Sequence, residues 1–272
     1  MVSKVIEDTK QWTLGPANYP VALPFNSGLK ESALDIRAFC NINSVRTTLI
    51  IECKKNNPEF IDWIFFPSVR RVSQNISLPF LNNQKNEANS WDVSSSLQQL
   101  PFDIVITDEA RETRGQYQSS TDKKTKTKTS NAAISDAAYQ VALATQAIHI
   151  EEAKFSKNEA TNKDAFRMPW SIQILLPTIV TSARIYTCTF DPSEVHPATG
   201  EISYSKATLT EQPYLIYKYP LPSHLQNIPE EVVGKLTMKN IDNYIRMNIF
   251  VVQSKMFQTF LNDVAARIDT LI

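Results

Sequence analysis

The sequence is poor in glycine and cysteine, and both shortages exclude classes of function. Only five glycines are present in 272 residues, and none forms the GxGxxG or Walker pattern of a nucleotide-binding loop. The three cysteines, Cys40, Cys53 and Cys188, lack the spacing of a metal centre, and their odd number argues against a disulfide framework. We therefore expect a protein of the reducing cytoplasm that does not bind nucleotides through a glycine-rich loop.

Long hydrophobic runs and an excess of one charge are also missing. The longest apolar run, Ile172 to Val180, is too short to span a bilayer and contains Pro177. Residues 1–10 are mixed and charged, unlike a secretory signal. Because 28 basic residues balance 28 acidic ones, any nucleic-acid site must be a local basic patch. We expect no membrane partner.

Histidine is scarce as well. His149, His196 and His224 show neither a zinc spacing nor a neighbouring nucleophile, and no GxSxG motif is present. What is present is the composition of a folded protein, with 42% hydrophobic and 21% charged residues. The length allows a sizeable core, and we expect a single domain over residues 1–272.

Hydrophobic periodicity predicts an α/β (α+β) fold with a mixed central β-sheet flanked by helices. The expected helices span residues 2–12, 131–153 and 255–268. The expected strands span residues 19–25, 33–41, 45–54, 170–180, 183–190, 214–219 and 248–253, with further apolar segments at 60–66 and 102–107. Residues 82–97 are rich in Asn and Ser and predict a loop.

Several segments are expected to interrupt this pattern. The residues from Gly15 to Asn18 should end the first helix, and Pro177 should make its strand irregular or place it at an edge. Residues 108–130 are polar and lysine-rich, which predicts a flexible basic insertion loop. Residues 200–272 form a C-terminal extension, whose amphipathic last helix suggests an interface for a homodimer or a partner protein.

The sequence Glu52-Cys53-Lys54 follows an apolar run that starts at Thr47. In a strand, Glu52 and Lys54 point to one face and Cys53 to the other. Asp35 lies on the preceding expected strand. Two carboxylates suit magnesium, and an ammonium stabilises the charge that develops when a phosphodiester is cleaved. The alternative is a pair of exposed acids that form salt bridges with Lys54 or Arg37.

The order helix, strand, strand with Asp35, strand with Glu52-x-Lys54, helix, strand resembles the PD-(D/E)xK nuclease superfamily, which has the restriction-endonuclease-like fold. The resemblance covers roughly residues 1–67, the long helix and the strands after it. Leu34 stands where the family often has proline. A Glu-x-Lys triplet alone is common, so its context on the strand carries most of the weight.

This resemblance implies a set of functional residues. Asp35, Glu52 and the backbone carbonyl of Cys53 would bind Mg²⁺, or Mn²⁺, and Lys54 would position or activate water. Glu7 on the first helix and Gln140 on the long helix are candidate helpers, although an ordinary surface residue is the favoured interpretation of each. The candidate contacts to nucleic-acid phosphates, all equally explained as solvated cations, are Lys55, Arg70, Arg71, Lys123 and Lys124.

The leading functional hypothesis is therefore a metal-dependent endo- or exodeoxyribonuclease acting on DNA in restriction, defence or repair. The alternative is a catalytically weak, nuclease-like DNA-binding or assembly module. The formal net charge of zero favours this alternative, because proteins that cleave DNA gain affinity from a basic excess.

Overall fold

The computed structural model describes the backbone over residues 1–25, 28–55, 61–67, 75–85, 91–101, 104–113, 132–161, 170–195, 197, 204–226 and 238–270. Four of the candidate phosphate contacts, Arg70, Arg71, Lys123 and Lys124, lie outside these residues. Among the described residues, no helix has both the length and the hydropathy needed to cross a membrane.

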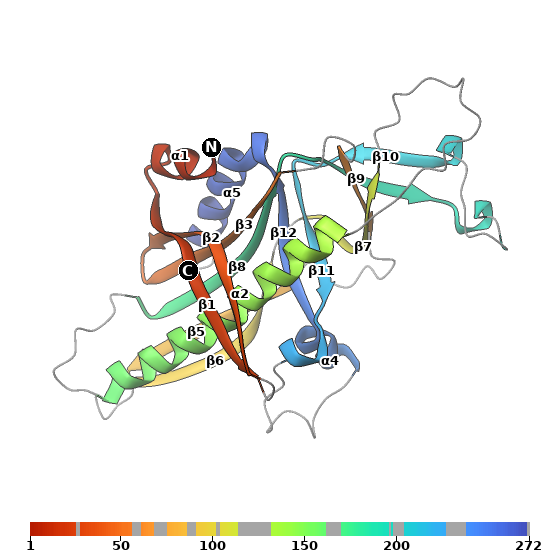
Figure 1. The fold of residues 1–272 in the computed structure, drawn as a ribbon. Coiled ribbons are helices and arrows are strands. Elements are labelled where there is room, and N and C mark those ends of the chain that lie inside the picture. The colour runs from red at the N-terminus through yellow and green to blue at the C-terminus, as the bar shows by residue number, and fades with distance from the viewer. Residues whose placement is uncertain are drawn as a thin grey trace.

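The described residues form one mixed sheet of twelve strands and four α-helices (Figure 1). The strands are β1 (Trp12–Phe25), β2 (Gly28–Ile42), β3 (Val45–Lys54), β4 (Asp62–Pro67), β5 (Asn75–Lys85), β6 (Trp91–Pro101), β7 (Ile106–Thr113), β8 (Ile172–Thr181), β9 (Arg184–Phe190), β10 (Ala207–Glu211), β11 (Tyr214–Pro220) and β12 (Arg246–Gln253). The helices are α1 (Val2–Asp8), α2 (Ala132–Thr161), α4 (Met238–Ile245) and α5 (Phe257–Asp269). The expected mixed α+β architecture is confirmed.

Strand β3 organises the centre of the sheet. Its Thr, Ile and Leu residues favour an extended, half-buried backbone, and it forms over the expected residues. It pairs antiparallel with β2 and, along its whole length from Val45 to Lys54, parallel with β8. On its other side β8 pairs parallel with β12, which pairs antiparallel with β11. Strands from the C-terminal extension are thus part of the central sheet.

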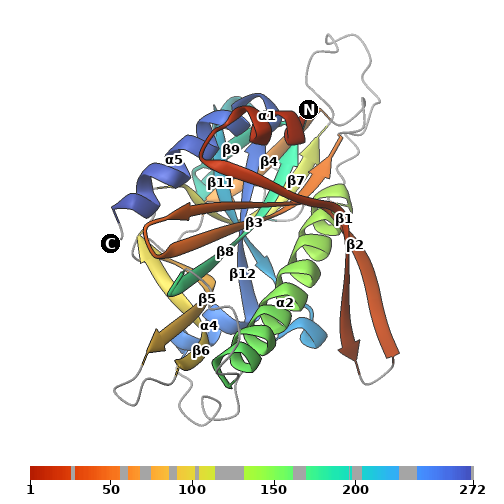
Figure 2. The same cartoon turned by 90° about the vertical axis from the view of Figure 1, so that its left-hand side faces the viewer.

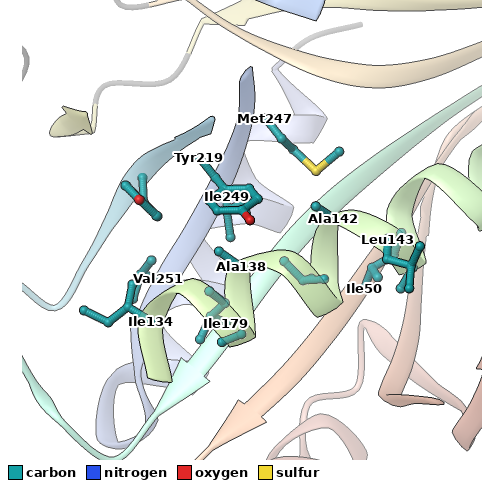
Figure 3. Packing of buried hydrophobic residues seen from close by; sticks show 14 of the residues in the cluster. Ile50, Ile134, Ala138, Ala142, Leu143, Ile179, Tyr219, Met247, Ile249 and Val251 are labelled. Atoms are coloured by element: carbon teal, nitrogen blue, oxygen red, sulfur yellow. The ribbon is translucent and has the colours of Figure 1, made fainter. Parts of the chain in front are cut away.

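The two faces of the sheet bury two separate cores. On one face α2 packs against residues such as Ile50, Ile179 and Val251 (Figure 3). On the other face α1 and α5 pack against the strand residues that alternate with these, among them Leu49 and Ile51 on either side of Ile50 (Figure 2). This alternation follows from the two-residue period of a strand. The apolar side of α5 is buried within the chain, which removes the reason for expecting an interface there.

The first helix and the first strand differ from the expectation. Helix α1 ends at Asp8, and β1 starts at Trp12 and runs through the segment that was expected to be a break. The register with β2 shifts between Leu14 and Ala17, so one extra residue forms a bulge, and Asn18 adopts a positive φ of 50°. A bulge allows the strand to bend without ending, and Figure 2 shows the far half of the β1–β2 hairpin turned away from the direction of its first half. Val21 and Leu34 of this far half belong to the same core as α2.

The prediction of a loop at residues 82–97 is wrong. Residues 82–85 belong to β5 and residues 91–97 to β6, and the two strands pair from Asn75 to Lys85. Strand β5 also pairs with β8 and buries Ile76, Leu78 and Leu81. Strand pairing and burial therefore override the weak strand propensity of Asn and Ser.

Pro177 does not lie in an edge strand, so that alternative of the prediction is wrong, whereas the pairing of β8 is irregular at this residue. Strand β8 is central, with β3 on one side. On its other side β5 pairs with Ile172–Ile174 and β12 with Thr178–Thr181. Pro177 falls between these two partners, where neither β5 nor β12 pairs with β8. Its missing N–H therefore breaks no ladder on that side. A similar correction applies to residues 108–113, which extend β7 instead of starting a loop.

A buried glutamate fixes the start of α2. The backbone N–H of Ile134 donates to Oε1 of Glu112 at 3.0 Å, and Glu112 is only 4% exposed on β7. The first N–H groups of a helix have no partner within the helix, and a carboxylate there also interacts favourably with the helix dipole. Glu112 thus links α2 to the sheet and sets where the helix begins.

We predict that Glu112→Ala destabilises the fold by about 1–2 kcal/mol, because an N–H at the start of α2 loses its acceptor. For a chain of this length, Tm should fall by roughly 2–8 °C. Glu112→Gln keeps an acceptor for this N–H, so its Tm should fall less than that of Glu112→Ala. Glu109→Ala, at an exposed position on the same strand, is the matched control in thermal unfolding. Equal Tm values for Glu112→Ala and Glu109→Ala would contradict the role of Glu112.

Candidate functional site

The site lies where β2 separates from β3. The last residue pair between these strands is Ile36 with Ile51. Asp35 is the next residue of β2, and its Oδ2 accepts a hydrogen bond from the backbone N–H of Cys53 at 2.7 Å. A side chain thus replaces the ladder bond at the point where the ladder stops. This hydrogen bond fixes the carboxylate of Asp35 beside the end of β3.

Glu52 and Lys54 lie side by side on the α2 face of β3. The Lys54 Nζ and Glu52 Oε1 atoms are 3.2 Å apart, and Glu52 is 5% exposed. Cys53 points to the opposite face, where it packs beside the core of α1 and α5. Burial raises the pKa of the Cys53 thiol to about 12, so the sulfur stays protonated and is a poor metal ligand.

Helix α2 adds a third polar group to the site. The Lys54 Nζ donates a hydrogen bond to Oε1 of Gln140 at 3.1 Å. The ammonium group is therefore held between an oxygen of the sheet and an oxygen of the helix. The position of Gln140 follows from the packing of α2 on the sheet, with Ile134, Ala138 and Ala142 in the core between them.

Two carboxylates in proximity raise the electrostatic cost of the site. The pKa of Glu52 is raised, first by burial and second by the negative charge of Asp35, whereas Lys54 acts in the opposite direction. A cation bound between the two carboxylates would offset both unfavourable effects. The electrostatics of Glu52 therefore favour a positively charged ligand beside it.

The donor set fits magnesium. Asp35 and Glu52 supply carboxylates, and the Cys53 carbonyl points to the same side of the strand as its N–H, toward Asp35. Among the described residues no group of three or more His, Cys, Asp or Glu side chains forms a metal cage. Magnesium does not require one, since it is commonly bound through one or two carboxylates and keeps several waters.

The other sequence candidates are placed differently. Glu7 is exposed on α1, which packs on the sheet face opposite α2, so the structure does not bring it to Glu52. Lys55 is exposed directly after β3 and lies at the edge of the site. The alternative of exposed acids in salt bridges holds in part. Glu52 does pair with Lys54, but it is buried and not exposed. Arg37 pairs with Glu152 of α2 and not with Asp35 or Glu52.

The ion pair between Arg37 and Glu152 was missed by sequence reasoning. Arg37 follows Asp35 by two residues on β2, and its partner in β3 is Ile50, which belongs to the α2 core. The two-residue spacing of Asp35 and Arg37 on β2 could have indicated that both point to one face. The sequence could not indicate Glu152 as the partner, because 115 residues separate Arg37 from Glu152.

Comparison with the known protein families, with curated proteins and with solved structures gave no match. No relative therefore assigns a role to any residue of the chain. The geometry around Asp35, Glu52, Lys54 and Gln140 is what a functional proposal has to explain.

We predict that Glu52→Gln stabilises the metal-free protein. The pKa of Glu52 is higher in the folded chain than in the unfolded chain, so ionisation of this group lowers stability once the pH exceeds its folded pKa. Glutamine mimics the protonated acid, and in EDTA at mildly alkaline pH the Tm should rise by about 2–4 °C.

The pH dependence provides the control for this prediction. Below the ordinary glutamate value of 4.5 the wild-type side chain is protonated in both states, so the difference in Tm should disappear. Glu7→Gln, at an exposed glutamate of α1, should leave Tm unchanged at every pH. A lower Tm for Glu52→Gln than for wild type in EDTA would show that ionised Glu52 does not destabilise the fold.

Proposed function

We propose that this protein is a metal-dependent nuclease that hydrolyses phosphodiester bonds of DNA. One observation carries the proposal: at the end of β3, Asp35 accepts from the N–H of Cys53, between Glu52 and Lys54, and Lys54 pairs with Glu52 and with Gln140 of α2. Two carboxylates and a positioned ammonium form the minimal set for cleaving a phosphodiester with the help of a metal ion.

The arrangement of elements around the site supports the resemblance to the PD-(D/E)xK superfamily. The strand with Asp35 is antiparallel to the strand with Glu52 and Lys54, and that strand is parallel to β8. Helix α2 precedes β8 in the chain and packs on the same face of the sheet as Glu52. We accordingly propose a restriction-endonuclease-like core made of α1, β1, β2, β3, α2 and β8.

In this proposal Asp35, Glu52 and the Cys53 carbonyl hold one divalent cation. A magnesium ion bound there supplies Lewis acidity to the phosphoryl oxygen and lowers the pKa of a coordinated water. Asp35 is already oriented by the N–H of Cys53, so little conformational entropy is lost when it takes up a ligand. The raised pKa of Glu52 makes cation binding weaken as the pH falls, because the ligand must be deprotonated.

Lys54 is proposed to stabilise the negative charge that develops on the phosphoryl group. Its Nζ is fixed by Glu52 at 3.2 Å and by Gln140 at 3.1 Å, which leaves its third N–H donor for a phosphate oxygen. A group that is already oriented requires no reorganisation during the reaction, and this is the condition under which electrostatic stabilisation is large. Gln140 is a positioning residue that acts through Lys54.

The second candidate function is a nuclease-like module that binds DNA or assembles with partners and has little catalytic activity. It is favoured by the formal net charge of zero, since non-specific affinity for DNA depends on cationic contacts. A module of this kind does not need two carboxylates at one point, and their mutual repulsion makes the site costly to keep.

We predict that the wild-type protein cleaves plasmid or linear DNA with magnesium or manganese and that Asp35→Ala and Lys54→Ala each lose activity by about 100-fold or more. Lys4→Ala is the matched control, because it removes an exposed lysine from α1, which packs on the sheet face opposite α2. Calorimetry should show divalent-ion binding in wild type and its loss in Glu52→Ala. Equal cleavage by wild type, Asp35→Ala and Lys54→Ala would exclude the proposed site.

We also predict that Gln140→Ala lowers kcat by about tenfold or more and leaves KM nearly unchanged, because it releases Lys54 without removing a contact to DNA. Gln146→Ala, further along α2, is the control for loss of a helical glutamine. The two variants should have similar Tm values. A change in KM alone for Gln140→Ala would argue against a positioning role.

A further inference from the structure

A row of aromatic rings and arginine side chains lies beside the site, and the proposed chemistry does not use it. The guanidinium of Arg46 lies between the rings of Phe39 and Trp170, with its central carbon 4.0 Å and 4.1 Å from their centroids. The guanidinium of Arg37 lies 4.9 Å from the Phe39 centroid and 5.7 Å from that of Tyr19. We call these five residues the arginine–aromatic stack.

The stack lies on the same face of the sheet as the site. Arg46 precedes Glu52 by six residues on β3, so the two side chains point to one face about 20 Å apart. Phe39 pairs with Thr48 of β3, which shares that face. Arg37 lies two residues from Asp35 on β2. The stack therefore starts next to the site and extends away from it along β2 and β3.

Arg46 has no ion-pair partner of its own among the described residues, although Glu152 lies near enough to favour its charge. Glu152 pairs with Arg37, and Glu151 accepts a hydrogen bond from the hydroxyl of Tyr19 at 3.1 Å. Within the described part of the chain, Arg46 makes neither an ion pair nor a hydrogen bond, and it is half-buried. Burial lowers the pKa of its guanidinium. The negative charge of Glu152 raises this pKa, and the positive charge of Arg37 lowers it. An anion beside Arg46 would offset this cost.

Three buried donors of the stack also lack a partner among the described residues: Nε of Arg37, Nε of Arg46 and the indole Nε1 of Trp170. Buried donors are normally paired, so several unpaired donors at one place need a specific explanation. All three are N–H groups, but each atom is itself buried, so they show that the interior of the stack lacks an acceptor and are not donors exposed to a ligand. A phosphate diester combines several acceptor oxygens with a negative charge, and a guanidinium fork matches its geometry.

We propose that the arginine–aromatic stack binds the phosphate backbone of the nucleic acid, with Arg46 as the phosphate contact. The position of this contact relative to the cleaved bond rests on the proposed nuclease function. The distance of about 20 Å between Arg46 and Glu52 equals roughly six phosphates along one strand of a duplex. Phe39 and Trp170 hold the guanidinium plane between them, so the fork presents a fixed edge to the backbone. The stack sets the path of the substrate, and the residues around Glu52 act on it.

The test measures binding of a fluorescently labelled DNA duplex in EDTA by anisotropy, so that cleavage does not contribute. Arg46→Gln should weaken binding about tenfold. The slope of log affinity against log salt should fall by about one, as expected for the loss of one phosphate contact. Arg46→Lys keeps the charge and loses the planar fork, and should be intermediate. Arg111→Gln is the control, since it removes one arginine at an exposed position of β7.

The outcomes separate this proposal from the nuclease proposal. If Arg46→Gln and Arg111→Gln bind DNA equally well, the stack is not a phosphate site, even if wild type cleaves DNA. If wild type binds DNA through Arg46 but does not cleave it with magnesium, the stack is a phosphate site and the nuclease proposal is wrong. If wild type does not bind the duplex in EDTA, the stack is not a phosphate site, and the cleavage assay with magnesium decides the nuclease proposal by itself.

A second measurement avoids variants that fold poorly. Wild-type protein is crosslinked by light to a duplex that carries photoreactive groups, and the crosslinked peptides are identified by mass spectrometry. Crosslinks to the peptide with Phe39 or the peptide with Trp170 are expected. Crosslinks that map only to other parts of the chain would overturn the proposal.

Discussion

The separation of β2 from β3 is the constraint on which the rest of the site depends. Up to the pair of Ile36 and Ile51 the two strands share ladder hydrogen bonds. Beyond this pair the N–H of Cys53 is satisfied by the carboxylate of Asp35. A continuous ladder would have used that N–H for a backbone carbonyl. The end of the pairing thus leaves the carboxylate of Asp35 beside the end of β3, near enough to Glu52 to raise the pKa of that residue.

Helix α2 is held at several points, and each of them positions the site. Glu112 of β7 binds the N–H of Ile134 at its start. Farther along, Glu151 accepts from Tyr19 and Glu152 pairs with Arg37, so the far half of the β1–β2 hairpin is fastened to the helix (Figure 2). Gln140 lies between these ends and inherits its position from them. Thr145, an exception in the apolar stripe of the helix, is accommodated because its hydroxyl bonds the carbonyl of Val141 at 2.7 Å.

The site carries an electrostatic cost. Ile50 and Ile51 precede Glu52 and are fully buried, so the carboxylate starts at the margin of an apolar layer. Its ionisation is opposed by burial and by Asp35, and Lys54 offsets only part of this. Apolar side chains at these positions would be less costly, so the retained charges are more easily explained by a ligand than by folding. The unpaired donors of the arginine–aromatic stack are a second cost of the same kind.

The sequence by itself determined those features that depend on local periodicity. The two-residue period of β3 placed Glu52 and Lys54 on one face and Cys53 on the other, and the Ala-rich 3.6-residue pattern located α2, although the helix continues to Thr161. The tertiary structure alone decided which distant groups meet. It joined Gln140 to Lys54 and Arg37 to Glu152, turned the Asn- and Ser-rich segment into β5 and β6, and placed Pro177 between two strand partners. Periodicity is a property of neighbouring residues, whereas strand partners, bulges and ion pairs between remote segments are set by how the whole sheet packs.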